Sequence, residues 1–136
     1  PGHAEVWATL RTRLDERMAA LCEDAETLVK ETAARHGLDL NFDYHEIFVA
    51  SLNAPEAVAH LRQAMDAEGI AHDEEQLPMR ASEDFGLFGR GSASAMFFLG
   101  SGEKHPQLHN PDYDFPDDLI PIGARVFMRV VRDRLG

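Results

Sequence analysis

The sequence predicts a mixed α/β chain, and three patterns carry that prediction. Residues 4–12 alternate between apolar and polar side chains, which is the period of a strand with one buried face. Residues 15–36 carry apolar side chains at helical spacing, and Gly37 supplies a C-terminal stop. Residues 95–99 are continuously apolar, as in a strand buried on both faces of a mostly parallel sheet. Strands and helices therefore alternate along the chain.

The first fifty residues predict a strand, a helix and a second strand. Asp15 stands where the N-cap of the 15–36 helix belongs, and residues 40–44 alternate again after that helix. This arrangement is half of a two-layer α/β sandwich. Because one helix and two strands cover their own sheet poorly, we expect partner strands, either from upstream residues or from a second copy of the chain.

The rest of the chain predicts two longer helices and one short helical turn. A helix over residues 54–68 follows Asn53, a residue type strongly preferred as an N-cap. Ser82 precedes the short turn, which two glycines end. The last helix covers residues 118–134 and tolerates Pro121 in its first turn. Three substantial helices are therefore expected.

Composition narrows the class of partner. The formal net charge is −11, which argues against nucleic acid and against an anionic membrane, because both call for a basic face. Cys22 is the only cysteine and cannot form an internal disulfide, so a reducing compartment such as the cytoplasm is expected. No apolar run approaches the roughly 20 residues needed to span a bilayer.

One loop histidine is the best candidate for a metal ligand. His109 follows the 95–99 run and a Gly-rich turn, and Pro111 stiffens its loop; a neutral imidazole so placed can ligate a metal ion. His105 lies four residues earlier, but Pro106 disfavours a regular helix that would bring both rings to one face. From residue type alone, a single loop histidine is more often solvated than metal-bound.

Several short segments, in their order and spacing, resemble the C-terminal signature of the M20 metallopeptidases. They are Ser82-Glu83-Asp84-Phe85, Phe97-Phe98-Leu99-Gly100, Leu108-His109-Asn110-Pro111, Asp114-Phe115 and Asp117-Asp118. The likeness is greatest to the amidohydrolase branch, which includes hippurate hydrolases, aminobenzoyl-glutamate hydrolases and auxin-conjugate hydrolases. Upstream, Pro1-Gly2-His3-Ala4-Glu5 and Leu52-Asn53-Ala54 are similar to the second half of the lid domain of that family, so the resemblance covers nearly the whole chain.

The resemblance implies a division of the chain and roles for three residues. Residues 1–52 would be the second half of an α/β lid, or dimerisation, domain, and residues 53–136 the C-terminal part of a mostly parallel-sheet catalytic domain. His109 would bind a metal ion, and Glu83 would accept a hydrogen bond from a ligand imidazole and orient it. Asn53 would contact the substrate from the lid, although its position also suits a helix cap. No catalytic residue is expected within this chain.

The function implied is that of a divalent-metal amidohydrolase. Two zinc or manganese ions would serve cleavage of the amide bond of an N-acyl amino acid or similar small conjugate, in a cytoplasmic homodimer joined through the lid. Since other ligands and the catalytic glutamate of such enzymes lie upstream, we expect a C-terminal fragment that is inactive and binds no metal firmly by itself. The alternative is a non-catalytic α/β interaction module. Metal ligands encoded upstream of Pro1 would favour the enzyme over the interaction module.

Overall fold

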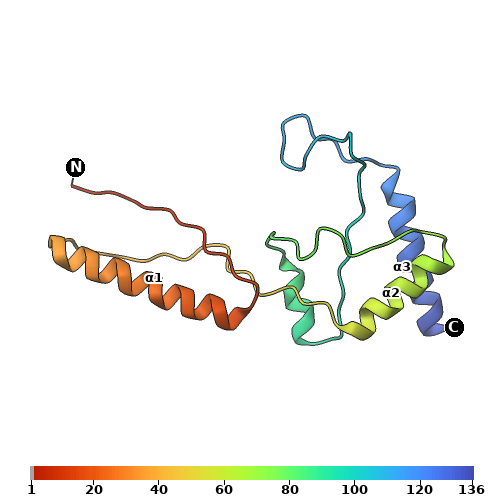
Figure 1. Ribbon diagram of the computed structural model, residues 1–136, viewed down its shortest axis with the longest axis horizontal. Helices are drawn as coiled ribbons and strands as arrows, with labels where there is room; N and C mark the ends of the chain where they lie inside the picture. Colours follow the sequence, from red (N-terminus) through yellow and green to blue (C-terminus); the bar gives the residue numbers. More distant parts are fainter. Residues whose placement is uncertain (1) are drawn as a thin grey trace. The chain divides into compact units, whose positions relative to one another are not determined.

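The computed structural model of the protein describes residues 2–136 and is built from helices joined by long irregular segments (Figure 1). The helices are α1 (Asp15–His36), α2 (Pro55–Ala67), the short 3-10 helix η1 (Asp84–Arg90) and α3 (Leu119–Leu135). The three helices predicted from the sequence are thus confirmed, each to within one residue at either end. None of the described helices is long and apolar enough to cross a membrane.

The predicted fold class is wrong, because residues 2–136 contain no strand and no sheet. This corrects both the α/β lid half and the mostly parallel-sheet catalytic part. The predicted strands at 4–12 and 40–44 have no regular secondary structure, and none of their backbone N–H or C=O groups bonds to another backbone group of residues 2–136. A strand exists only where its backbone pairs with a neighbour. Alternation of side chains predicts which face is to be buried, but it does not provide that neighbour.

The residues group into two compact units. Unit 1 comprises the chain up to Ser51 together with Pro78–Leu87, and unit 2 comprises Leu52–Leu77 together with Phe88–Gly136. The chain therefore passes between the units at three places, the first of them between Ser51 and Leu52.

In unit 1, the C-terminus of α1 is capped as predicted, but its N-terminus is not. At its C-terminus Gly37 takes φ +64°, and the N–H groups of Gly37 and Leu38 bond to the carbonyls of Ala34 and Ala33, so the predicted stop is confirmed. At its N-terminus the predicted cap is wrong, since no side chain caps the helix. The Asp15 carboxylate instead accepts a hydrogen bond from the distant N–H of Ala50 at 2.7 Å.

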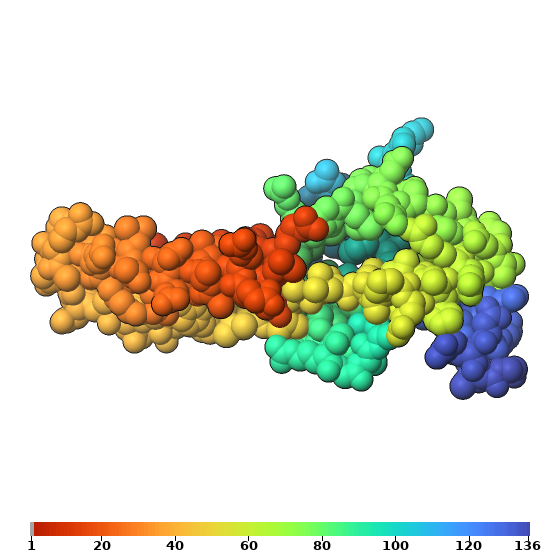
Figure 2. All heavy atoms as spheres, turned by 60° about the horizontal axis from the view of Figure 1, so that its bottom comes forward, coloured from red at the N-terminus to blue at the C-terminus, as the bar shows by residue number. Residues whose placement is uncertain are grey.

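Two extended segments of unit 1 run beside α1, as Figure 1 shows. The rings of Trp7 and His45 stack with centroids 6.1 Å apart, which joins one segment to the other. The Tyr44 hydroxyl donates to Glu26 of α1 at 2.7 Å, which fastens the second segment to the helix. In Figure 2 the atoms of these segments and α1 form a narrow body along the helix. Side chains, and not a backbone ladder, hold this part together.

In unit 2, α2 and α3 pack against each other around a small apolar core. Val126 of α3 is fully buried against Ala64 and Met65 of α2. Around this centre lie four partly buried apolar side chains: Leu61, Ile70, Phe97 and Val130. Phe97 belongs to the apolar run 95–99, which therefore lies against the helix pair although it forms no strand.

Candidate functional site

The loop that carries His109 is built from consecutive turns. The Asn110 N–H bonds to the Gln107 carbonyl at 3.0 Å, and the Tyr113 N–H bonds to the Asn110 carbonyl at 3.0 Å. Within the first turn His109 takes φ +71°, in the left-handed region that non-glycine residues seldom occupy but that histidine enters more readily than most. The turn leaves the residue exposed to solvent. No hydrogen bond or ion pair within the described chain occupies its ring.

His105 has a different environment. Its side chain is half-buried, and its Nδ1 lies 3.0 Å from the carbonyl oxygen of Pro106. Because that partner can only accept, Nδ1 carries the proton. The Tyr113 ring meets the imidazole edge-on, with centroids 5.2 Å apart. His105 is therefore held in place by its own loop, whereas His109 is presented outward.

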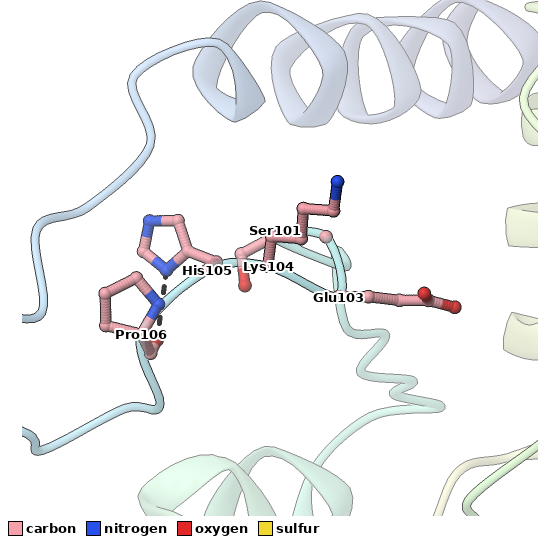
Figure 3. Close-up of a pocket in the computed structure, with 6 residues that line it drawn as sticks. Ser101, Glu103, Lys104, His105 and Pro106 are labelled. Carbon is pink, nitrogen blue, oxygen red and sulfur yellow. Dashed lines mark hydrogen bonds between the residues drawn. The ribbon is translucent and has the colours of Figure 1, made fainter.

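A wide hollow of about 570 Å³ lies beside the same loop and is lined by residues 101–106. Figure 3 shows the Glu103, Lys104 and His105 side chains pointing in different directions. Ligand sites usually bring a few polar groups together on one point. The hollow accordingly has room for a small molecule but no convergent set of polar contacts.

The donor set for a metal ion is incomplete in this chain. Residues 2–136 contain no group of three or more His, Cys, Asp or Glu side chains that could hold an ion. Protein sites for zinc use three or four such ligands. The residues described here therefore do not fit a complete metal site, and His109 can supply only a single imidazole to one.

Glu83 lies in the part of the chain that belongs to unit 1. Its neighbour Ser82 accepts a hydrogen bond from Arg11 Nη1 at 2.9 Å. A β-carbon on Gly86, just downstream, would lie 2.5 Å from the carbonyl oxygen of Val49. Glu83 itself is exposed. The segment around Glu83 is thus attached to unit 1, while His109 belongs to unit 2.

Asn53 does not cap α2, so that interpretation is wrong. The N-cap residue is Ala54, and Pro55 opens the helix without a side-chain cap. The Asn53 carboxamide bonds to the backbone of Met96 instead, through Nδ2 to the carbonyl and through Oδ1 to the N–H, both at 2.9 Å. One Nδ2 proton is left over.

A sequence model of peptidase family M20/M25/M40 matches residues 2–133. The chain belongs to this family. The match takes in both compact units.

One curated relative bears on the activity. The chain is 25% identical over 118 residues to a Bacillus subtilis (strain 168) protein named "Putative amidohydrolase YhaA". The aligned part is 82% of this chain and 30% of that protein. The M20-family chain thus spans about a third of the length of its relative. No solved structure matches it significantly.

Sequence reasoning missed three contacts that shape the region around the candidate residues. They are the Arg11–Ser82 hydrogen bond, the close approach at Gly86 and the Asn53–Met96 pair. Each joins residues more than thirty positions apart, and no local pattern reports such a pairing. The glycine inside the Asp84–Arg90 turn was a usable sign, because a helical glycine is costly unless a close contact requires it.

Proposed function

We propose that the whole protein is a divalent-metal amidohydrolase that cleaves the amide bond of an N-acyl amino acid or a similar small conjugate. Membership of peptidase family M20/M25/M40 and the amidohydrolase name of its relative support a hydrolase. The observation that carries the proposal to this chain is the exposed imidazole of His109, whose ring has no partner within residues 2–136. Residues held in sparsely populated backbone conformations cluster at active sites and ligand-binding sites.

Three residues take roles in this proposal. His109 contributes an imidazole to a zinc or manganese site that other residues of the whole protein complete. Glu83 accepts a hydrogen bond from a ligand imidazole and fixes its orientation. Asn53 offers its remaining Nδ2 proton to the substrate. The catalytic groups themselves lie elsewhere in the whole protein.

Hydrolysis assays test the proposed activity. The whole protein is offered N-acyl amino acids with aromatic and aliphatic acyl groups, and release of the free amine is measured. We expect cleavage that a chelator abolishes and that added zinc or manganese restores, while the 136-residue chain alone releases nothing. Absence of cleavage by metal-loaded protein, or cleavage that survives complete metal removal, would contradict the proposal.

We also propose that two copies associate through unit 1. Val6, Trp7 and Ile47 are 94%, 80% and 79% exposed, and the backbone beside them has no backbone partner within residues 2–136. Large exposed apolar side chains next to unpaired backbone favour association with another chain. Sedimentation analysis should give a dimer for the natural sequence and a monomer for Trp7→Lys. If the natural protein and Trp7→Lys are both monomers, this interface is refuted.

The cytoplasm, where Cys22 would stay reduced, is the proposed location.

A further inference from the structure

Asn53 is joined to Met96 by both ends of its carboxamide. Nδ2 donates to the Met96 carbonyl and Oδ1 accepts from the Met96 N–H, each at 2.9 Å, across 43 positions of sequence. Next to this pair the Ala54 N–H donates to the Ser94 carbonyl at 2.8 Å. Three hydrogen bonds therefore fix residues 53–54 to residues 94–96 within unit 2. We call this set the Asn53 clasp.

The chemistry of the clasp is specific for asparagine. Two paired residues of neighbouring strands exchange one N–H and one C=O each, and here a side-chain amide takes the place of one peptide group. Aspartate would offer oxygen to both Met96 groups and so oppose the Met96 carbonyl. Alanine would offer nothing. The two contacts also fix the orientation of the amide, because the flipped form would set oxygen against oxygen.

The segment held by the clasp is anchored on its other side by α3. The ring of Phe97 packs against that of Phe127 with centroids 5.5 Å apart. The Leu99 side chain lies on Gly123, where an added β-carbon would be 3.2 Å from Leu99 Cδ1. Met96 is thus fixed by hydrogen bonds and its neighbours Phe97 and Leu99 by packing. The loop bearing His109 leaves from the end of this segment.

We infer that Asn53 is a positioning residue, which holds residues 94–99 in one register so that the following loop presents His109 from a fixed place. It acts through the Met96 backbone and not by touching the reacting groups. The clasp also ties down unit 2 at the first residues after the chain leaves unit 1. Its catalytic consequence rests on the proposed function, whereas its structural consequence can be measured without any substrate.

Amide hydrogen exchange of the 136-residue chain, followed by NMR, tests the structural part. In Asn53→Ala the Met96 amide should exchange at least tenfold faster, since it loses Oδ1, the one acceptor it has within residues 2–136, while amides inside α2 and α3 keep their rates. Asn41→Ala is the matched control, because the Asn41 amide bonds only to Asp43 in unit 1. An unchanged Met96 rate in Asn53→Ala would overturn the inference.

Kinetics of the whole protein separate positioning from substrate contact. If Asn53 positions the His109 loop, Asn53→Ala lowers kcat at least tenfold and Asn53→Asp does the same, in addition to any rise in KM from loss of the proposed substrate contact. A rise in KM at unchanged kcat would show substrate contact alone and overturn the positioning role. If the natural protein cleaves no amide, the proposed function fails, and the exchange rates of Met96 still decide whether the clasp exists.

Discussion

At the scale of single residues, a tyrosine and a glutamate fasten the second extended segment to α1. The Tyr44 hydroxyl donates to Glu26 Oε1 at 2.7 Å, and Lys30 Nζ donates to Glu26 Oε2 at 2.5 Å. The hydrogen bond to the Glu26 carboxylate raises the pKa of Tyr44 to about 12. The hydrogen bonds from Lys30 and then from Tyr44 lower the pKa of Glu26. The Glu26 carboxylate thus favours the protonated Tyr44 hydroxyl, and the Tyr44 hydroxyl favours the ionised Glu26 carboxylate.

These shifts define a pH window for the attachment. Tyr44 has a raised pKa when folded, so its contribution is complete below its ordinary pKa of 10.0 and is lost as pH rises through about 12. Glu26 has a lowered pKa, so its contribution is complete above its ordinary 4.5 and is lost as pH falls through the folded value. The segment should therefore stay attached between those limits.

Glu26→Gln tests this pairing. Removing the carboxylate should bring the pKa of Tyr44 back towards its ordinary value, because the negative charge that opposes the phenolate is gone. Ultraviolet titration of the phenolate absorbance would show the Tyr44 step moving to lower pH. Glu31→Gln removes one charge from the same helix and should leave that step in place. Equal behaviour of the two variants would contradict the assignment.

The candidate residues were visible in the sequence to different degrees. His109 could be singled out from its loop and its motif, and its exposed position agrees with a ligand role that remains a proposal. Its left-handed backbone conformation could not be predicted, because the following Asn110-Pro111 does not by itself specify the φ of the residue before it. The two hydrogen bonds between Asn53 and the Met96 backbone could not be predicted either. A preferred capping residue placed just before a helix favoured the wrong partner.

At the scale of elements, η1 depends on the absence of a side chain at Gly86. A β-carbon there would stand 2.5 Å from the Val49 carbonyl oxygen and 2.8 Å from that of Ala50. Both are backbone atoms, which cannot swing away as the end of a flexible side chain could. Gly86 is also buried, so the turn and the 49–50 backbone are in direct contact within unit 1.

Gly86→Ala should lower the free energy of unfolding by about 1–3 kcal/mol, the usual cost of overpacking a closely filled site. Urea denaturation followed by circular dichroism measures it. Gly91→Ala is the matched control, since nothing lies within 4 Å of an added β-carbon there, and it should be neutral or slightly stabilising. If Gly86→Ala is as stable as Gly91→Ala, the close contact does not exist.

The helices were predictable and the strands were not, for a physical reason. A helix satisfies its backbone within its own sequence, so apolar spacing and the stop at Gly37 sufficed for α1. A strand needs a second segment, and the alternating residues 4–12 and 40–44 have no backbone partner within residues 2–136. Glu46, with φ +53°, also interrupts the extended path of the second segment.

At the scale of the whole molecule, the incomplete set of metal ligands predicts how tightly the isolated chain binds a metal ion. Since residues 2–136 bring no three ligating groups together, the isolated chain should bind zinc or manganese only weakly. Calorimetric titration with each ion should give no dissociation constant tighter than about a micromolar. Tight binding would mean that His105, His109 and Asp112 rearrange into a site of their own.

Metal content of the whole protein is the most direct measure of the role given to His109. His109→Gly removes the imidazole and leaves the φ of +71° accessible, so the turn keeps its shape. His72→Ala is the control, because that ring is paired with Asp66 at 3.1 Å. By elemental analysis after dialysis, the natural protein and His72→Ala should retain zinc or manganese, and His109→Gly should lose at least half of it. Full metal content in His109→Gly would show that His109 is not a ligand.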